Sequence, residues 1–154
     1  MRILGIDPGL SGGLCIIEND NIYDLRPMPI YELKNKKALH TANLKLIINE
    51  ADIIIIEDVH AMPKQGVTSS FNFGKGFGII QGICIGLGKE IKLISPMKWK
   101  KEMGVTSDKG TSIEKALQIN PDINLMATPR SRKPHDGMAE AFLIAKYYLM
   151  SKGS

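Results

Sequence analysis

The sequence predicts an α/β fold with a mixed five-stranded sheet, an antiparallel meander followed by parallel strands, flanked by helices. Two observations support this prediction. The first 28 residues contain three largely apolar runs separated by short polar turns, and a run of four isoleucines follows an amphipathic stretch. A strand, a helix and a second strand in this order form a parallel pair with a right-handed crossover.

The meander occupies the start of the chain. Three strands are expected there, at residues 2–7, 11–18 and 21–28. The Asn19-Asp20 pair between the last two strands suits a tight turn, because both residue types tolerate turn conformations. The first strand is largely apolar until it ends at Asp7.

A helix and a central strand come next. Between residues 38 and 51, four apolar side chains have the spacing of one helix face: Leu44, Ile47, Ile48 and Ala51. Residues 52–57 contain the four isoleucines, which suits a strand covered on both faces. Because the carboxyl ends of parallel strands meet at one edge of a sheet, Asp7 and Glu57 are expected at the same edge.

Glycine recurs at a regular spacing in the next segment. Residues 59–72 are expected to form an irregular loop, followed by a helix over residues 74–88. Along that helix a stripe of small residues recurs at every fourth position: Gly74, Gly78, Gly82 and Gly86. The stripe fits close packing within one subunit and a dimer contact equally well.

The remaining elements are a short strand and three helices, at residues 90–95, 96–103, 111–118 and 134–150. The last helix is expected to begin at Pro134, since proline suits the first helical position.

Size and composition indicate one domain over residues 1–154, without a linker. The longest mostly apolar run, residues 77–87, is far shorter than the roughly 20 residues that cross a bilayer, so no membrane protein is expected. The N-terminus lacks the pattern of a signal peptide, and Cys15 and Cys84 lack metal-ligand spacing. We therefore expect a cytoplasmic protein with two reduced cysteines.

Positive charge is concentrated in one segment. Residues 1–85 contain 8 basic and 9 acidic side chains, whereas residues 86–133 contain 10 basic and 5 acidic ones. Such a segment can replace counterions on a nucleic acid, although a solvated surface is the plain alternative. Candidate phosphate contacts are Lys98, Lys100, Lys101, Lys109, Arg130, Arg132 and Lys133. Trp99, between two of these lysines, is expected to pack in the core rather than on DNA.

Four acids are candidates for a metal site: Asp7, Glu57, Asp136 and Glu140. The last two share a helix face at i, i+4, and carboxylates that converge repel one another unless a cation neutralises them. Mg²⁺ prefers such hard oxygen ligands, with Mn²⁺ expected to substitute, and two ions would suit phosphodiester hydrolysis. Each acid also has an ordinary explanation as a turn, strand-end or helix-start residue.

Four motifs in this order resemble RuvC-type Holliday junction resolvases on a ribonuclease H-like fold: Gly5-Ile-Asp7-Pro-Gly9, Ile56-Glu57, Ser95-Pro-x-x-x-Lys100, and His135-Asp136 with Ala139-Glu140-Ala141. The similarity spans the whole chain, and residues 62–78 are similar to phage and prophage-like members. The resemblance implies a homodimer that binds a four-way DNA junction and nicks two opposing strands with Mg²⁺-activated water. It also implies that the four acids are the metal ligands.

The sequence departs from the family pattern at the last two acids. The family commonly spaces them three residues apart, whereas here residue 139 is alanine and the acid is Glu140. Either spacing keeps the pair on one helix face, so Glu140 is the expected ligand, with Asp58 as the alternative.

The resemblance assigns further roles. Lys100 and Lys109 are expected to steady the scissile phosphate, and His135 to assist the leaving group or orient a phosphate. Phe71 and Phe73 lie where the family places an aromatic residue that stacks on unpaired bases. From the residues alone, the lysines suit a solvated surface, the histidine a structural role and the phenylalanines helix packing.

Two other functions remain open at this point. Actin-like ATPases also begin with a Gly-Ile-Asp-x-Gly strand, but they need a second such domain, which 154 residues cannot contain. A nuclease of the same fold that acts on RNA or on other branched DNA would share the acids, and only its substrate preference would distinguish it.

Overall fold

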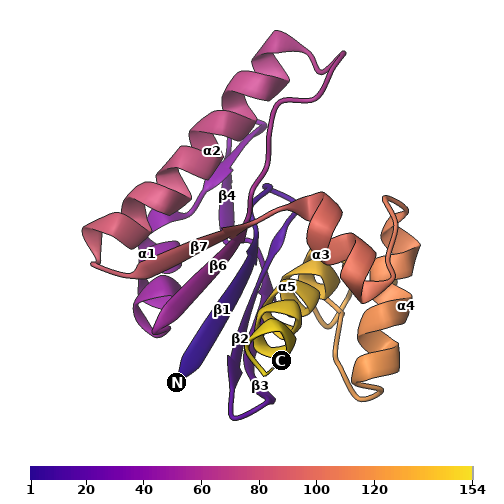
Figure 1. Cartoon of the computed structure of the whole chain (residues 1–154). Helices are drawn as coiled ribbons and strands as arrows, with labels where there is room; N and C mark the ends of the chain where they lie inside the picture. The colour runs from indigo at the N-terminus through magenta and orange to yellow at the C-terminus, as the bar shows by residue number, and fades with distance from the viewer. Residues whose placement is uncertain (154) are drawn as a thin grey trace.

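The computed structural model describes residues 1–153 and confirms the mixed five-stranded sheet (Figure 1). In sheet order the strands are β3 (Asn21–Pro27), β2 (Gly13–Glu18), β1 (Arg2–Asp7), β6 (Ile53–Glu57) and β7 (Glu90–Ile94). The first three are antiparallel, and β6 and β7 continue the sheet in parallel with β1. The tight turn at Asn19 and Asp20 is also confirmed, because both residues have positive φ, at 49° and 68°.

Helices cover both faces of the sheet. One face packs against α1 (Thr41–Asn49) and α2 (Val67–Gly86), and the other against α3 (Pro96–Met103), α4 (Lys109–Ile119) and α5 (Asp136–Lys152). Alternation along β1 separates the two cores, since Leu4 and Ile6 face α1 and α2 whereas Ile3 faces α5. The fold is therefore a three-layer α/β arrangement with a core on each side of the sheet.

Helix α5 approaches the sheet unusually closely. A Cβ atom on Gly5 would lie 2.3 Å from the carbonyl oxygen of Ala141, and one on Gly13 would lie 2.5 Å from that of Gly137. Only glycine leaves room for backbone at these positions. The glycines of the first two strands therefore set how deep the first turns of α5 lie over the strand ends.

The sequence did not predict a β-hairpin between β3 and α1. Strands β4 (Ile30–Leu33) and β5 (Lys36–Leu39) pair antiparallel in a separate two-stranded sheet. Their two-residue turn has positive φ at Lys34 and Asn35, as a type I′ turn requires. The turn contains no glycine, so its sequence gave no hairpin signal.

Helix boundaries also differ from the prediction, since α1 begins at Thr41 and not at residue 38, and α4 extends one to two residues beyond 111–118 at each end. Helix α2 begins at Val67, so Phe71 and Phe73 lie within the helix and not in a preceding loop. Helix α5 begins at Asp136 and not at Pro134, because the His135 side chain accepts the backbone N–H of Met138 and caps the helix there.

Both cysteines are free and buried, as expected. None of the helices within residues 1–153 combines the length and the apolar character that crossing a lipid bilayer requires.

Candidate active site

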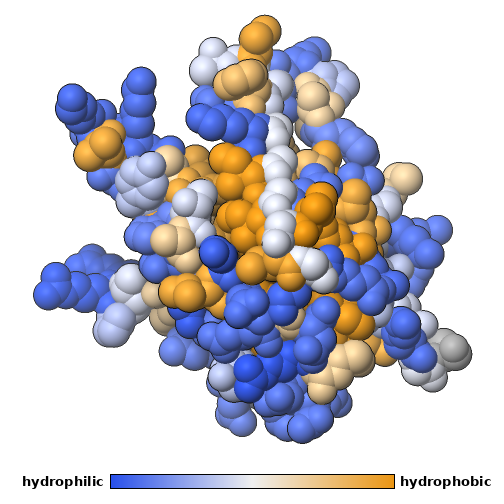
Figure 2. All heavy atoms as spheres, turned by 90° about the vertical axis from the view of Figure 1, so that its left-hand side faces the viewer, coloured by the Kyte–Doolittle hydropathy of each residue, from blue (hydrophilic) through white to orange (hydrophobic). Residues whose placement is uncertain are grey.

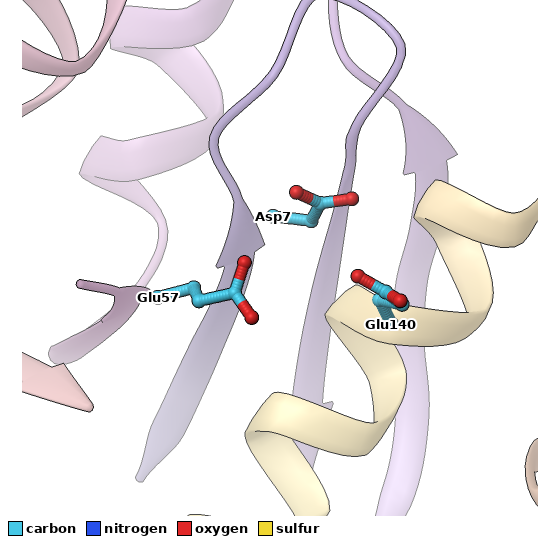
Figure 3. Close-up of side chains that lie close together, drawn as sticks. All are labelled: Asp7, Glu57 and Glu140. Atoms are coloured by element: carbon cyan, nitrogen blue, oxygen red, sulfur yellow. The ribbon is translucent and has the colours of Figure 1, made fainter. Parts of the chain in front are cut away.

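Three of the four predicted acids converge at one edge of the sheet. Asp7 ends β1, Glu57 ends β6, and Glu140 lies in the second turn of α5. One carboxylate oxygen of each lies within 4.8 Å of the others, and Figure 3 shows the three side chains directed toward a common space. Glu57 and Glu140 are 6% and 9% exposed, so the cluster is largely removed from water.

Strand register and helix packing together produce this convergence. Ile6 of β1 pairs with Ile56 of β6, so the next residues, Asp7 and Glu57, leave adjacent parallel strands at the same level. The close approach of α5 at Gly5 then brings Glu140 over these strand ends. Each acid thus lies on a regular element, which holds it more precisely than a loop would.

The cluster is electrostatically unfavourable without a counterion. Burial, together with the charges of Glu140 and Glu57 and against a smaller lowering by Lys100, raises the pKa of Asp7 to about 8. Burial also raises the pKa of Glu57, opposed by the hydrogen bond from Trp99. A cation bound among these carboxylates would offset their mutual repulsion, and an all-oxygen donor set fits a divalent ion such as Mg²⁺.

The fourth acid lies outside this cluster of three. The side chain of Asp136 forms an ion pair with Lys109, with 3.0 Å between its Oδ2 and the lysine Nζ. Asp136 is one helical turn before Glu140, and its charge still contributes to the raised pKa of Asp7. In this structure, therefore, Asp136 is held at the rim by a lysine at the start of α4.

Glu140 has two donors of its own. Lys100 of α3 places its Nζ 3.3 Å from Glu140 Oε1, and the hydroxyl of Ser112 on α4 donates to the same oxygen at 3.2 Å. Ser112 is fully buried, and our sequence reasoning missed it. A serine that shares the buried face of an amphipathic helix with Ala116 was the available signal.

Glu57 has a donor that was also missed. The indole Nε1–H of Trp99 donates to Glu57 Oε1 at 2.9 Å. The expected core packing of Trp99 is confirmed, since the residue is fully buried. A buried indole N–H needs an acceptor, so the hydrogen bond could have been anticipated, although not its partner.

The remaining predicted site residues lie on α2, on α3, at the cap of α5 and on the loop before it. His135 Nδ1 accepts the N–H of Met138 at 3.1 Å, so a neutral ring carries its proton on Nε2 and can donate outward. Phe71 is 69% exposed on α2, whereas Phe73, two residues later, is half-buried. Exposed basic side chains lie on α3 and on the loop before α5: Lys98, Lys101, Arg130, Arg132 and Lys133.

No family model matches this sequence. Among solved structures, RuvC of Thermus thermophilus matches with a TM-score of 0.59 and 15% identity, over 99% of this chain and 97% of that one. RuvC of the same organism in complex with a Holliday junction substrate matches with a TM-score of 0.57 and 15% identity, over 100% and 98% of the two chains. The yeast mitochondrial Holliday junction resolvase Ydc2 matches with a TM-score of 0.63 and 14% identity, over 99% and 79%.

These matches cover the whole chain and both faces of its sheet, and at such low identity they establish the fold. The chain has the RuvC-type ribonuclease H-like fold that its motifs indicated.

Proposed function

We propose that residues 1–154 form a single RuvC-like nuclease domain that binds four-way DNA junctions and nicks two opposing strands. The observation that supports this most is the buried group of Asp7, Glu57 and Glu140 at the carboxyl edge of the sheet, on a fold shared with RuvC and Ydc2. One of those neighbours was solved with a Holliday junction substrate, which supports branched DNA as the ligand of this chain.

The three clustered acids would hold Mg²⁺ or Mn²⁺, with Asp136 as a further ligand at the rim. A bound divalent cation supplies the positive charge that activates water and stabilises the leaving oxygen of a phosphodiester. The protein keeps the acids in place through donors from neighbouring elements: Trp99 to Glu57, and Ser112 and Lys100 to Glu140.

Positive groups around the acids suit a phosphate. Lys100 and Lys109 already form ion pairs with Glu140 and Asp136, so each lies beside the position that a scissile phosphate would occupy. The Nε2–H of His135 is directed away from its helix cap and can donate to a phosphate oxygen. The exposed basic residues of α3 and of the loop before α5 would contact the DNA backbone farther out.

We further propose a homodimer, since two opposing strands need two sites related by a two-fold axis. Helix α2 offers the contact surface. Figure 2 shows a pale strip on this side of the molecule with apolar side chains on both sides. The exposed glycines of α2 have no atom of another element within 4 Å of an added Cβ: Gly74, Gly78, Gly82 and Gly86. This open space over the stripe supports a contact with a second subunit rather than packing within one subunit.

One experiment tests the proposed activity. The protein is incubated with a labelled mobile four-way junction, a linear duplex of equal length and an RNA hairpin, each with and without Mg²⁺. We expect metal-dependent nicks in opposing strands of the junction and a largely uncut duplex. Faster cutting of the duplex would contradict junction specificity, and equal cutting of RNA and junction would favour an RNA-processing nuclease. Fractionation would test the expected location in the cytoplasm.

A further inference from the structure

Each glutamate of the carboxylate cluster, formed by Asp7, Glu57 and Glu140, is held by a buried donor from a neighbouring helix. Trp99 of α3 donates its indole Nε1–H to Glu57 Oε1 at 2.9 Å. Ser112 of α4 donates its hydroxyl to Glu140 Oε1 at 3.2 Å. Both donors are fully buried, so bulk water does not compete for them. One oxygen of each glutamate is therefore already engaged by the protein.

The Oε1 atom of Glu140 has a second donor, because Lys100 Nζ lies 3.3 Å from it. A carboxylate oxygen offers two lone pairs, so the two donors occupy both. The two donors differ in how firmly they are placed. The lysine ammonium is on a flexible four-carbon stem and its side chain is 24% exposed, whereas the hydroxyl of Ser112 is fixed by a buried helix face. Ser112 is thus the donor that fixes the orientation of Glu140.

This arrangement favours one kind of cation. Glu57 and Glu140 reach the cluster from β6 and from α5, and each has its other oxygen left for an ion (Figure 3). Ca²⁺ takes six to eight oxygen ligands and commonly uses both oxygens of a carboxylate, whereas Mg²⁺ is smaller, requires octahedral geometry and keeps several waters. A glutamate with one engaged oxygen therefore suits Mg²⁺ better than Ca²⁺.

A purely structural role, in which each donor only satisfies a buried acid, is the alternative. Packing alone does not require a hydroxyl at position 112, since Ser112 shares the buried face of α4 with Ala116. Within residues 1–153, the Ser112 hydroxyl donates to Glu140 Oε1. Its loss is therefore expected to change how Glu140 binds a cation, which a structural role would not predict.

We propose that Ser112 and Trp99 are positioning residues that set the cation preference of the site. They hold Oε1 of Glu140 and of Glu57, leave one oxygen of each for the ion, and so favour Mg²⁺ over Ca²⁺. The proposal rests on the proposed function, because it concerns the same metal site. It adds that two residues which contact neither metal nor DNA decide which metal is bound.

The preference is measured as the ratio of the dissociation constants for Mg²⁺ and Ca²⁺, without DNA. Each ion displaces Mn²⁺ from the whole chain, and electron paramagnetic resonance measures the unbound Mn²⁺. Ser112→Ala frees Glu140 Oε1 to turn toward a large cation. We expect Mg²⁺ binding to weaken about 10-fold, a loss typical of removing a hydrogen bond to a metal ligand. Ca²⁺ binding should be unchanged or tighter.

Two further variants and a control accompany this measurement. Ser112→Thr keeps a hydroxyl and should restore the wild-type ratio. Trp99→Phe removes the donor to Glu57 and should shift the ratio in the same direction as Ser112→Ala. Ser151→Ala is the control, because that hydroxyl donates at 2.8 Å to the carbonyl oxygen of Tyr148 near the end of α5 and should not affect the ratio. Circular dichroism at the titration temperature checks that each variant is folded.

The outcomes separate the two proposals. If Ser112→Ala and Trp99→Phe leave the ratio unchanged, or weaken Mg²⁺ and Ca²⁺ binding by the same factor, the two residues have only a structural role and the inference is wrong. Junction cleavage by the wild type would then still support the proposed function. If the wild type binds neither Mg²⁺ nor Mn²⁺ and does not cut junctions, the proposed function and this inference both fail.

Discussion

The two longest helices, α5 and α2, place their apolar residues in opposite environments. Helix α5 has 17 residues and buries eleven of them, on the sheet and under α4. Helix α2 has 20 residues, is the more apolar of the two, and buries only Ile80 and Cys84 (Figure 1). The rest of the chain covers most of α5, whereas one apolar face of α2 stays uncovered.

This difference places the carboxylate cluster and the proposed dimer contact on different helices. Glu140 lies on the helix that the core fixes, so its position over Asp7 and Glu57 does not depend on a partner. The glycine stripe lies on the face of α2 that the core does not cover, together with exposed Phe71 and Ile85. Under the proposed function, a single chain would hold the metal ion, and a second copy of the chain would cover α2.

The largest effect is expected on α5. Glu140→Gln should reduce metal-dependent junction cleavage at least about 100-fold, about 2.7 kcal/mol of barrier, because a neutral amide removes one charge from the cluster. Junction binding should persist. Glu114→Gln, the same change on an exposed part of α4, is the control and should cut normally. Near-normal cutting by Glu140→Gln would direct the search to Asp58.

The next prediction compares how alanine substitutions at a glycine of β1 and at a glycine of α2 change the free energy of unfolding. Gly5→Ala forces a Cβ to within 2.3 Å of the Ala141 carbonyl and should destabilise the fold by about 3 kcal/mol. Gly78→Ala on α2 meets no other element and should stabilise the helix by up to about 1 kcal/mol. Urea unfolding at low protein concentration measures both changes. Equal effects would mean that α5 does not pack as closely as described.

Assembly is tested on α2 alone. An added Cβ on Gly82 meets no atom of the described residues within 4 Å, so Gly82→Leu should leave the fold intact and shift the protein from dimer toward monomer. Paired nicking should fall, while single nicks persist. Light scattering at tens of micromolar protein checks this, with Glu114→Leu as a control for an added surface leucine. A wild type that is monomeric both alone and on junction DNA would refute the α2 interface.

The smallest effect concerns pH. The pKa of Asp7 rises from its ordinary value of 3.8 to about 8 in the folded protein, so the fold favours the protonated acid. Its contribution to stability is complete below about pH 4 and is lost as the pH rises toward 8. Mg²⁺ should therefore raise the melting temperature more at pH 8 than at pH 6, and Asp7→Asn should remove this difference. Equal shifts at both pH values would indicate binding elsewhere.

Periodicity predicted the parts of the site that depend on secondary structure. Parallel pairing of an apolar strand with the isoleucine strand placed Asp7 and Glu57 at one edge, and the helix period placed Asp136 and Glu140 on one face. The helix period does not show, however, which of these two side chains lies close enough to Asp7 and Glu57 to join them. Residues four apart on a helix differ by about 6 Å along its axis, so only Glu140 joins the cluster while Asp136 pairs with Lys109.

The hydrogen-bond donors to Glu57 and Glu140 could not be predicted from the sequence. The hydrogen bonds of Trp99 to Glu57 and of Ser112 to Glu140 join residues 42 and 28 positions apart, on elements whose relative placement no local pattern encodes. The hairpin was missed for a local reason, since Lys34 and Asn35 adopt a conformation in which glycine is the usual signal.

The hydrogen bond from Trp99 also gives the protein an internal fluorophore at its carboxylate cluster. Trp99 is the only tryptophan in the chain, so all indole emission comes from a ring that touches Glu57. A change in the charge around Glu57 alters the electric field at that ring and shifts its emission. Metal and junction titrations can therefore be followed on the unlabelled protein, and Trp99→Phe provides the dark reference.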